Sequence, residues 1–244
     1  MSATDWGSRT SLILGDAACL KLQNAHVLVA GAGGVGGIAI EMLARAGVGE
    51  MTILDGDRVD VTNRNRQLVA LVSTVGRYKT EAWADRLRDI NPEIKLHLHN
   101  RYFTAEDMEQ ILAAASYDCV LDAIDTVAPK TALLAACVRN HIPVVSCMGA
   151  GAKMDPEAVK SDDISKTIMC PLARVIRTNL KKLGITRGIR AVYSTEKALE
   201  HAVVPSDDCG QNKKSITGTI SFMPNIFGCH CASEVIKLLM KDVY

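Results

Sequence analysis

The sequence predicts an α/β fold with a mostly parallel sheet covered by helices on both faces. Two observations predict it. Short apolar runs typical of buried strands alternate with helical segments through the first 150 residues, and a glycine-rich turn separates the first run from the first helix. Alternation of this kind favours parallel strands joined by helical crossovers. We therefore expect the 244 residues to form one continuous domain, 1–244.

Apolar periodicity and punctuating residues define the expected elements of the first 150 residues. Asn91-Pro92 should end one helix, Thr104 should cap the next, and Pro129 suits the first turn of a third. Strands are expected at 26–30, 51–54, 94–98, 119–123 and 143–146, and helices at 38–46, 80–90, 104–115 and 129–140.

The pattern continues past Gly149-Ala150-Gly151 with less regular spacing. Strands are expected at 157–164 and 191–194, and the segment 219–223 should lead into a last helix. A helix at 171–183 should bury one apolar face, made of Leu172, Val175, Ile176, Leu180 and Leu183. The polar segment 196–215 is rich in turn-forming residues and is expected to be a mobile loop.

Composition excludes several classes of protein. The net charge of +1 excludes a globally basic nucleic-acid coat, so any nucleic-acid site must be a local patch. The polar segment 1–9 has no apolar signal core, and the apolar run 220–240 is interrupted by charged residues and reads as a packed helix, not a membrane span. Cys119 and Cys147 lie in apolar runs, which suits buried thiols in a reducing cytoplasm.

The glycine-rich turn Gly31-Ala32-Gly33-Gly34-Val35-Gly36 follows a predicted strand and opens a predicted helix. Glycines let backbone N–H groups approach a phosphate, and a helix N-terminus adds a favourable dipole. Asp55 ends the second strand, where a carboxylate commonly accepts hydrogen bonds from a ribose. The turn predicts a Rossmann-like nucleotide site but does not choose between a dinucleotide and ATP, so a dehydrogenase remains one alternative.

A second motif follows that turn. The stretch from Asp55 to Gln67 carries Asp-x-Asp and then Asn-x-x-Arg-Gln, Val75-Gly76 precedes Lys79, and Asp122-Ala-Ile-Asp125 follows the fourth strand. This order resembles the ubiquitin-activating-enzyme-like (ThiF/MoeB/HesA) adenylating superfamily over nearly the whole chain, and most specifically from 26 to 150. The resemblance implies a nucleotide-binding half at 1–150 and a substrate-binding half at 151–244.

The resemblance also assigns roles around ATP and Mg²⁺. It implies that Arg66 and Lys79 contact the phosphates, that Asn63 and Gln67 position them, and that Asp125 holds magnesium. Cations placed this way stabilise charge that develops on the α-phosphate. Asp122 is expected to cap a turn. The nucleotide-binding set is Gly31, Gly33, Gly34, Gly36, Asp55, Asp57, Asn63 and Gln67.

Arg9 matches an arginine that in this superfamily reaches the active site of a neighbouring subunit. The resemblance therefore implies a symmetric homodimer, and two-fold dimers are the commonest oligomers. The full catalytic set is then Arg9, Arg66, Lys79 and Asp125.

A basic segment distinguishes the second half. Residues 164–190 contain no Asp or Glu, and Arg174, Arg177 and Lys181 share one side of the predicted helix, with Lys166 just before it. This stripe suits either a solvated helix face or contact with a phosphate backbone. The segments 163–174, 193–196 and 221–235 resemble the tRNA threonylcarbamoyladenosine dehydratases.

This resemblance implies ATP-dependent cyclisation of threonylcarbamoyladenosine in tRNA through an acyl-adenylate, with no cysteine required. The alternatives are an adenylyltransferase that activates the C-terminus of a ubiquitin-like sulfur-carrier protein, and a non-enzymatic nucleotide-binding scaffold.

Cysteine spacing bears on these alternatives. None of the eight cysteines forms a Cys-x-x-Cys pair, which removes the usual zinc site of relatives that activate ubiquitin-like proteins. Cys170 and Cys209 are the candidates for a thioester cysteine, whereas Cys229-His230-Cys231 lies in an apolar segment and is expected to be buried.

Overall fold

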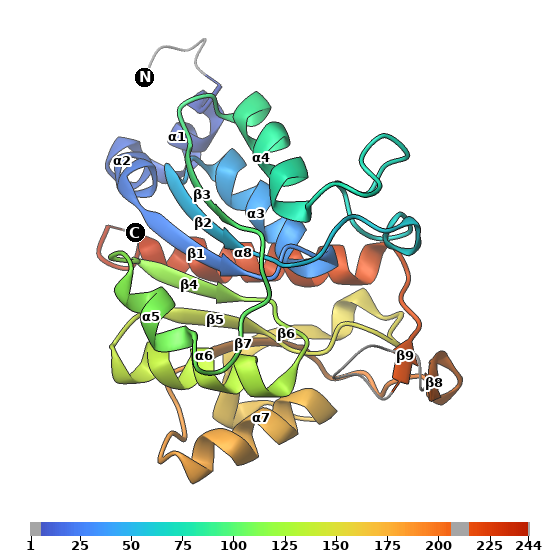
Figure 1. The fold of residues 1–244 in the computed structure, drawn as a ribbon. Helices are drawn as coiled ribbons and strands as arrows, with labels where there is room; N and C mark the ends of the chain where they lie inside the picture. The colour runs from blue at the N-terminus through green and yellow to red at the C-terminus, as the bar shows by residue number, and fades with distance from the viewer. Residues whose placement is uncertain (1–5, 206–214, 244) are drawn as a thin grey trace.

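The computed structural model describes residues 6–205 and 215–243 (Figure 1). Its centre is a seven-stranded sheet with the order β3-β2-β1-β4-β5-β7-β6. Neighbouring strands are parallel except β6, which pairs antiparallel with β7. The strands are β1 His26–Ala30, β2 Glu50–Leu54, β3 Lys95–His99, β4 Cys119–Asp122, β5 Val144–Cys147, β6 Val159–Asp163 and β7 Arg190–Ser194. The expected mostly parallel α/β sheet is confirmed.

Helices cover both faces of the sheet (Figure 1). One buried cluster joins α2, α3, α4 and α8 to the sheet, and a second joins α5, α6 and α7 to its other face. The helices are α1 Ser8–Leu14, α2 Asp16–Asn24, α3 Gly34–Ala46, α4 Lys79–Ile90, α5 Met108–Ala113, α6 Val127–Arg139, α7 Pro171–Lys182 and α8 Phe222–Leu239, with short 3-10 helices at Val61–Asn63, Pro156–Ala158, Ile164–Lys166 and Glu200–Ala202.

The helix α8 returns from the C-terminal half to pack on the nucleotide-binding half. It crosses α3 so closely that a Cβ on Gly228 would lie 2.6 Å from the carbonyl oxygen of Val35. Nearby, Glu41 of α3 is buried and accepts hydrogen bonds from Arg45 and from Arg86 of α4. Elements from both ends of the described chain therefore share one buried cluster.

Several local expectations were wrong. The first predicted helix begins at Gly34, since the glycine turn itself supplies the first helical turn. Thr104 does not cap α5, because its N–H and hydroxyl donate to the carboxylate of Asp107, the residue that precedes that helix. In α7, Val175 and Leu183 are 44% and 46% exposed, so the buried face is narrower than predicted.

The C-terminal segment also differs from its prediction. Within the polar stretch 196–215, residues Glu200–Ala202 form a helical turn and β8 (Val203–Pro205) pairs antiparallel with β9 (Ser215–Thr217). Residues 206–214, with Cys209, lie outside the described part. No helix of the described residues is long and apolar enough to span a membrane.

The cysteines are partly as expected. Cys119 and Cys147 are buried. Cys170 is also buried, which argues against a thioester at this position. Cys229 is exposed, contrary to prediction, whereas Cys231 is buried, because neighbouring positions of α8 face different sides of the helix.

Candidate active site

The turn between β1 and α3 can be built only from glycine at two positions. Gly31 has φ +94°, and a Cβ there would lie 2.8 Å from the carbonyl oxygen of Ala123. A Cβ on Gly36 would lie 1.8 Å from the carbonyl oxygen of Gly31. The backbone is therefore bare where α3 begins, and a helix N-terminus without side chains is suited to phosphate.

Asp55 follows β2 and is held against this turn. Its carboxylate accepts hydrogen bonds from the N–H of Ala32 at 2.7 Å and of Asp57 at 2.8 Å. Burial raises the pKa of Asp55, although the ammonium of Lys79 and the two N–H donors oppose that rise. The Asp55 carboxylate therefore adjoins the glycine turn.

Lys79, the first residue of α4, is almost fully buried. Its Nζ donates to Asp57 Oδ2 at 2.6 Å, and the hydroxyl of Tyr102 donates to the other oxygen of that carboxylate at 2.6 Å. The hydrogen bond to Asp57 raises the pKa of Tyr102 to about 12. The Lys79 ammonium has three N–H donors and shares the Asp57 carboxylate with Tyr102. It can therefore still donate a hydrogen bond to a phosphate oxygen.

Sequence reasoning did not identify Tyr102. The one hint in the sequence is a glycine at position 56. In the structure a Cβ on Gly56 would lie 2.6 Å from the backbone nitrogen of Tyr102. The segment after β3 therefore packs directly on the Asp55–Asp57 segment, a contact that no local pattern encodes.

The 61–67 segment lies over the glycine turn. Asn63 is buried, and its Oδ1 accepts from the N–H of Asp60, so it stabilises this segment. Arg66 donates from Nη1 to the carbonyl of Thr62, and its Cγ lies 3.5 Å from where a Cβ on Gly34 would be. Arg66 thus lies beside the turn, whereas Asn63 stabilises the backbone of its own segment.

Gln67 carries an unsatisfied polar atom. Its buried Oε1 has no hydrogen-bond partner within the described protein, while its Nε2 lies 3.7 Å from the position of a Cβ on Gly33. A buried polar atom without a partner is costly, and a bound ligand or water is one way to supply the missing donor. This amide therefore supports the predicted nucleotide position.

Asp122 and Asp125 have separate places after β4. Asp122 is completely buried and accepts from Ser146 Oγ at 2.6 Å and from the N–H of Ile124 at 3.1 Å, and it forms an ion pair with Lys130 at 2.6 Å. It therefore shapes the turn, as expected. Asp125 is exposed on the same turn, just before α6.

The sequence analysis also did not identify Lys130, although a lysine within an otherwise apolar helix indicates a buried charge. Its fully buried Nζ donates to the carbonyls of Ile124 and Cys147 at 3.0 and 2.7 Å. The lysine thereby joins the turn that carries Asp125 to the end of β5.

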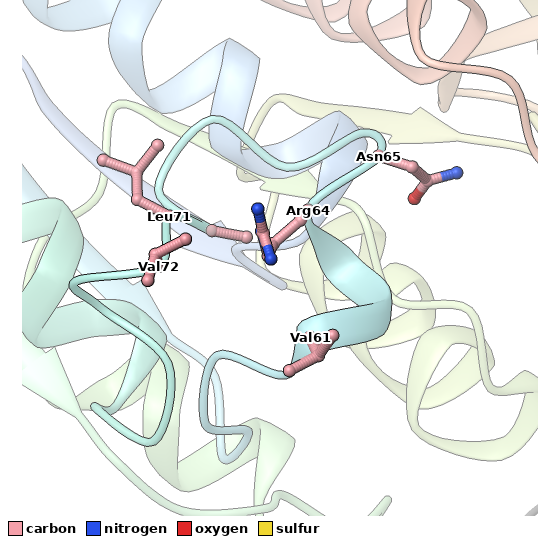
Figure 2. Close-up of a pocket in the computed structure, with 6 residues that line it drawn as sticks. Val61, Arg64, Asn65, Leu71 and Val72 are labelled. Carbon is pink, nitrogen blue, oxygen red and sulfur yellow. The ribbon is translucent and has the colours of Figure 1, made fainter.

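A hollow of about 590 Å³ lies along the 61–72 segment (Figure 2). Its lining is Val61, Arg64, Asn65, Ala70, Leu71 and Val72. The guanidinium of Arg64 points into this space (Figure 2). None of the predicted nucleotide-binding residues lines it, so it is distinct from the glycine turn.

Two sets of predicted residues lie away from this site. Arg9 is exposed on α1, which lies near α2 and away from the ends of β1 and β2 that carry the site (Figure 1). On α7, Arg174 and Lys181 are exposed, but Arg177 is half-buried and donates to the carbonyl and hydroxyl of Thr167. Among the three residues of the basic stripe, Arg177 is therefore the one whose guanidinium is partly occupied by a contact within the protein.

Lys166 is exposed and pairs with Asp162 at 3.3 Å. The ammonium therefore lies at the surface, in the 3-10 helix Ile164–Lys166 that precedes α7.

The fold and site define an α/β nucleotide-binding protein whose phosphate turn is flanked by a lysine, an arginine and a buried amide. The chain belongs to the ThiF family, which matches residues 8–243. It is 38% identical over 242 residues to the tRNA threonylcarbamoyladenosine dehydratase of Bacillus subtilis, covering 97% of this chain and 95% of that protein.

The structures agree with this assignment. The E. coli tRNA N6-threonylcarbamoyladenosine dehydratase in complex with ATP superposes with a TM-score of 0.87 and 36% identity, covering 99% of this chain and 98% of that one. An AMP complex matches equally well. The adenylyltransferase and sulfurtransferase MOCS3 of Culex quinquefasciatus is 44% identical over 127 residues, but these cover 52% of this chain and 28% of that protein.

Proposed function

We propose that this protein is an ATP-dependent enzyme that dehydrates threonylcarbamoyladenosine in tRNA to a cyclic product. The observation that carries the proposal is full-length likeness to an enzyme of that name solved with ATP. The glycine turn, the buried lysine and the buried amide of this chain support it. The likeness to a sulfur-carrier adenylyltransferase covers about half of the chain, so that alternative has less support.

The residues at the turn fit ATP. The bare N-terminus of α3 would bind phosphate oxygens, and Asp55 would accept from the ribose hydroxyls. Lys79 would turn from Asp57 toward the phosphates, and Arg66 and Gln67 would bind from the 61–67 segment. Glycine at positions where a Cβ would clash and a buried Gln67 oxygen without a partner both suit a ligand at this place.

Asp125 would hold Mg²⁺ that accompanies ATP. Carboxylates are preferred ligands of this hard cation, and the exposed side chain follows β4, the strand beside β1. When bound, the ion would neutralise phosphate charge. Asp122 does not fit this role, because it is fully buried and already paired with Lys130.

The reaction has two steps. A threonyl carboxylate oxygen bonds to the α-phosphorus of ATP while the bond to the β-phosphate bridging oxygen breaks, which gives an acyl-adenylate and pyrophosphate. The neighbouring carbamoyl group then attacks the activated carbonyl carbon, AMP leaves with the former carboxylate oxygen, and one proton is released. Lys79 and Arg66 stabilise charge on the phosphate, and the tethered nucleophile gains from proximity.

Nucleoside mass analysis tests this function. Incubation of tRNA carrying threonylcarbamoyladenosine with the protein, ATP and Mg²⁺ should yield a nucleoside lighter by one water, with AMP and pyrophosphate in equal amounts. Lys79→Met should lower the rate at least about 100-fold, in the range expected for lost electrostatic stabilisation. The matched control Lys197→Met, a surface change, should keep full activity. Unchanged nucleosides, or product without ATP, would reject the proposal.

A homodimer with shared sites is part of the proposal. Arg9 lies on α1 with Leu12 and Ile13, which are 88% and 71% exposed, and such apolar side chains on one short helix suit a second copy. Arg9 would then enter the partner's site. Arg9→Ala and Asp125→Ala subunits should each be inactive, and mixing them should restore one complete site per mixed dimer. A mixture that remains inactive while subunits demonstrably exchange would exclude this arrangement.

The tRNA would contact the basic surface of α7. Exposed Arg174 and Lys181, with Lys166, would bind phosphates without reading bases. Changing Arg174 and Lys181 together to Gln should lower the salt slope of tRNA binding by about two, one per lost phosphate contact, and leave ATP affinity unchanged. The control pair Lys21→Gln and Lys241→Gln removes equal charge elsewhere. If the two double variants showed the same salt slope of tRNA binding, the basic surface of α7 would be only a solvated face.

A further inference from the structure

Three metal-ligating side chains meet at the amino ends of the parallel strands. His26 begins β1 and Glu50 begins β2, and these two residues are partners in the strand register. His97 lies in β3 and is the partner of Thr52 in β2. The nucleotide site occupies the carboxyl ends of the same strands, so this cluster has no part in the proposed reaction.

The ligand atoms lie close enough to share one ion. Glu50 Oε1 is 2.7 Å from His97 Nε2 and 3.6 Å from His26 Nδ1. One ligand atom from each of the three residues lies within 4.8 Å of the others. Ligands about 2.0–2.1 Å from a tetrahedral zinc ion lie about 3.3 Å apart, so small side-chain rotations suffice.

A buried hydroxyl orients one of the three ligand side chains. The other ring nitrogen of His26, Nε2, lies 2.9 Å from the hydroxyl of buried Thr52. When the Nε2–H of His26 donates a hydrogen bond to the Thr52 hydroxyl, Nδ1 keeps its lone pair and faces Glu50. Metal-binding histidines characteristically use their second nitrogen in this way. The ring of Tyr117 packs 4.7 Å from His26 and limits its rotation.

The charges around the cluster suit a cation. Lys95 and Asp118 are charged groups beside the cluster, and their opposite charges leave Glu50 as the net counterion.

We propose that His26, Glu50 and His97 bind a divalent transition-metal ion of the zinc class. Two imidazoles and one carboxylate are typical zinc ligands, and the half-exposed His97 side chain leaves a fourth position open to water. All three ligands lie on adjacent strands of the rigid sheet, so the ion would join the three strands β1, β2 and β3.

Zinc titration of the purified protein against a chromogenic chelator tests the site. Wild type should bind one zinc ion here, and His97→Gln should weaken that binding by more than about 100-fold, since a lost ligand exceeds the 10–100-fold typical of a lost supporting group. Thr52→Val, which keeps the shape of the side chain, should cost about tenfold or more. His99→Gln is the matched control, because His99 lies two residues along on the same face of β3 and outside the cluster.

Thermal unfolding and cobalt spectra complete the test. Zinc should raise the Tm of wild type and His99→Gln but not of His97→Gln, because an ion that binds only the folded state stabilises it. Cobalt should give ligand-field bands without a thiolate charge-transfer band. Equal zinc affinity in wild type and His97→Gln, or a thiolate band, would overturn the proposal and point to the exposed thiol of Cys229. Activity need not change, so the result is independent of the proposed reaction.

Discussion

Replacing Lys130 by Met should strongly destabilise the protein. Both Lys130 and Asp122 have completely buried side chains, and their charged atoms lie 2.6 Å apart. Methionine fills a similar volume but removes the charge and the donors to the carbonyls of Ile124 and Cys147. Asp122 would keep Ser146 as a donor but would lose its counterion.

The magnitude follows from the cost of an uncompensated buried charge. Removing one partner of a buried pair costs about 3–5 kcal/mol. The total stability of a domain is about 5–15 kcal/mol, so a large fraction would be lost. With a urea m-value of about 2–3 kcal/mol/M, the denaturation midpoint should fall by about 1–2.5 M.

Urea denaturation followed by circular dichroism measures this loss. Adding Asp122→Asn to Lys130→Met should restore at least half of it, because neither member of the buried pair then carries a charge. The control Lys197→Met breaks an exposed pair with Glu200 and should leave the midpoint unchanged. If Lys130→Met lowers stability by less than about 1 kcal/mol, or if Asn at position 122 restores nothing, the buried-pair reasoning is wrong.

Three further changes test other contacts. Gly36→Ala should cost at least about 2 kcal/mol in urea denaturation, because its Cβ would lie 1.8 Å from a carbonyl oxygen, whereas Gly33→Ala meets only ordinary contacts. The stability that Tyr102 gains from Asp57 should be present below about pH 10 and lost as pH rises through about 12, so wild type and Tyr102→Phe should converge in alkaline urea titrations. The two arginines on Glu41 outweigh its burial and lower its pKa, so its contribution should be present at pH 7 and lost as pH falls through that lowered pKa. Glu41→Gln should therefore destabilise at pH 7 and differ less from wild type at about pH 3, and an equal difference at both pH values would contradict this assignment.

The sequence by itself determined the architecture of the first half. Strand–helix alternation and the glycine turn depend on local periodicity and on backbone geometry, which neighbouring residues encode. For this reason the mostly parallel sheet was predicted correctly. The family resemblance added roles to individual residues, and family membership is confirmed.

Local periodicity was less informative where contacts between distant segments decide burial. Val175 and Leu183 suited an apolar helix face, yet both remain exposed because the neighbouring elements cover only a narrower strip of α7. Cys229 was expected to be buried in an apolar helix and is exposed, since burial depends on which side of α8 meets α3 and the sheet.

Only the tertiary structure decided which polar groups act together. Asp57 and Tyr102 share a hydrogen bond across 45 positions, Asp122 and Ser146 across 24, and His97 and Glu50 across 47. Parallel strands place their equivalent ends side by side whatever their separation in the chain, so residues from three or four segments converge at each edge of the sheet. A sequence pattern shows that such residues exist, but their shared protons, buried charges and common ligands arise from the strand order and register.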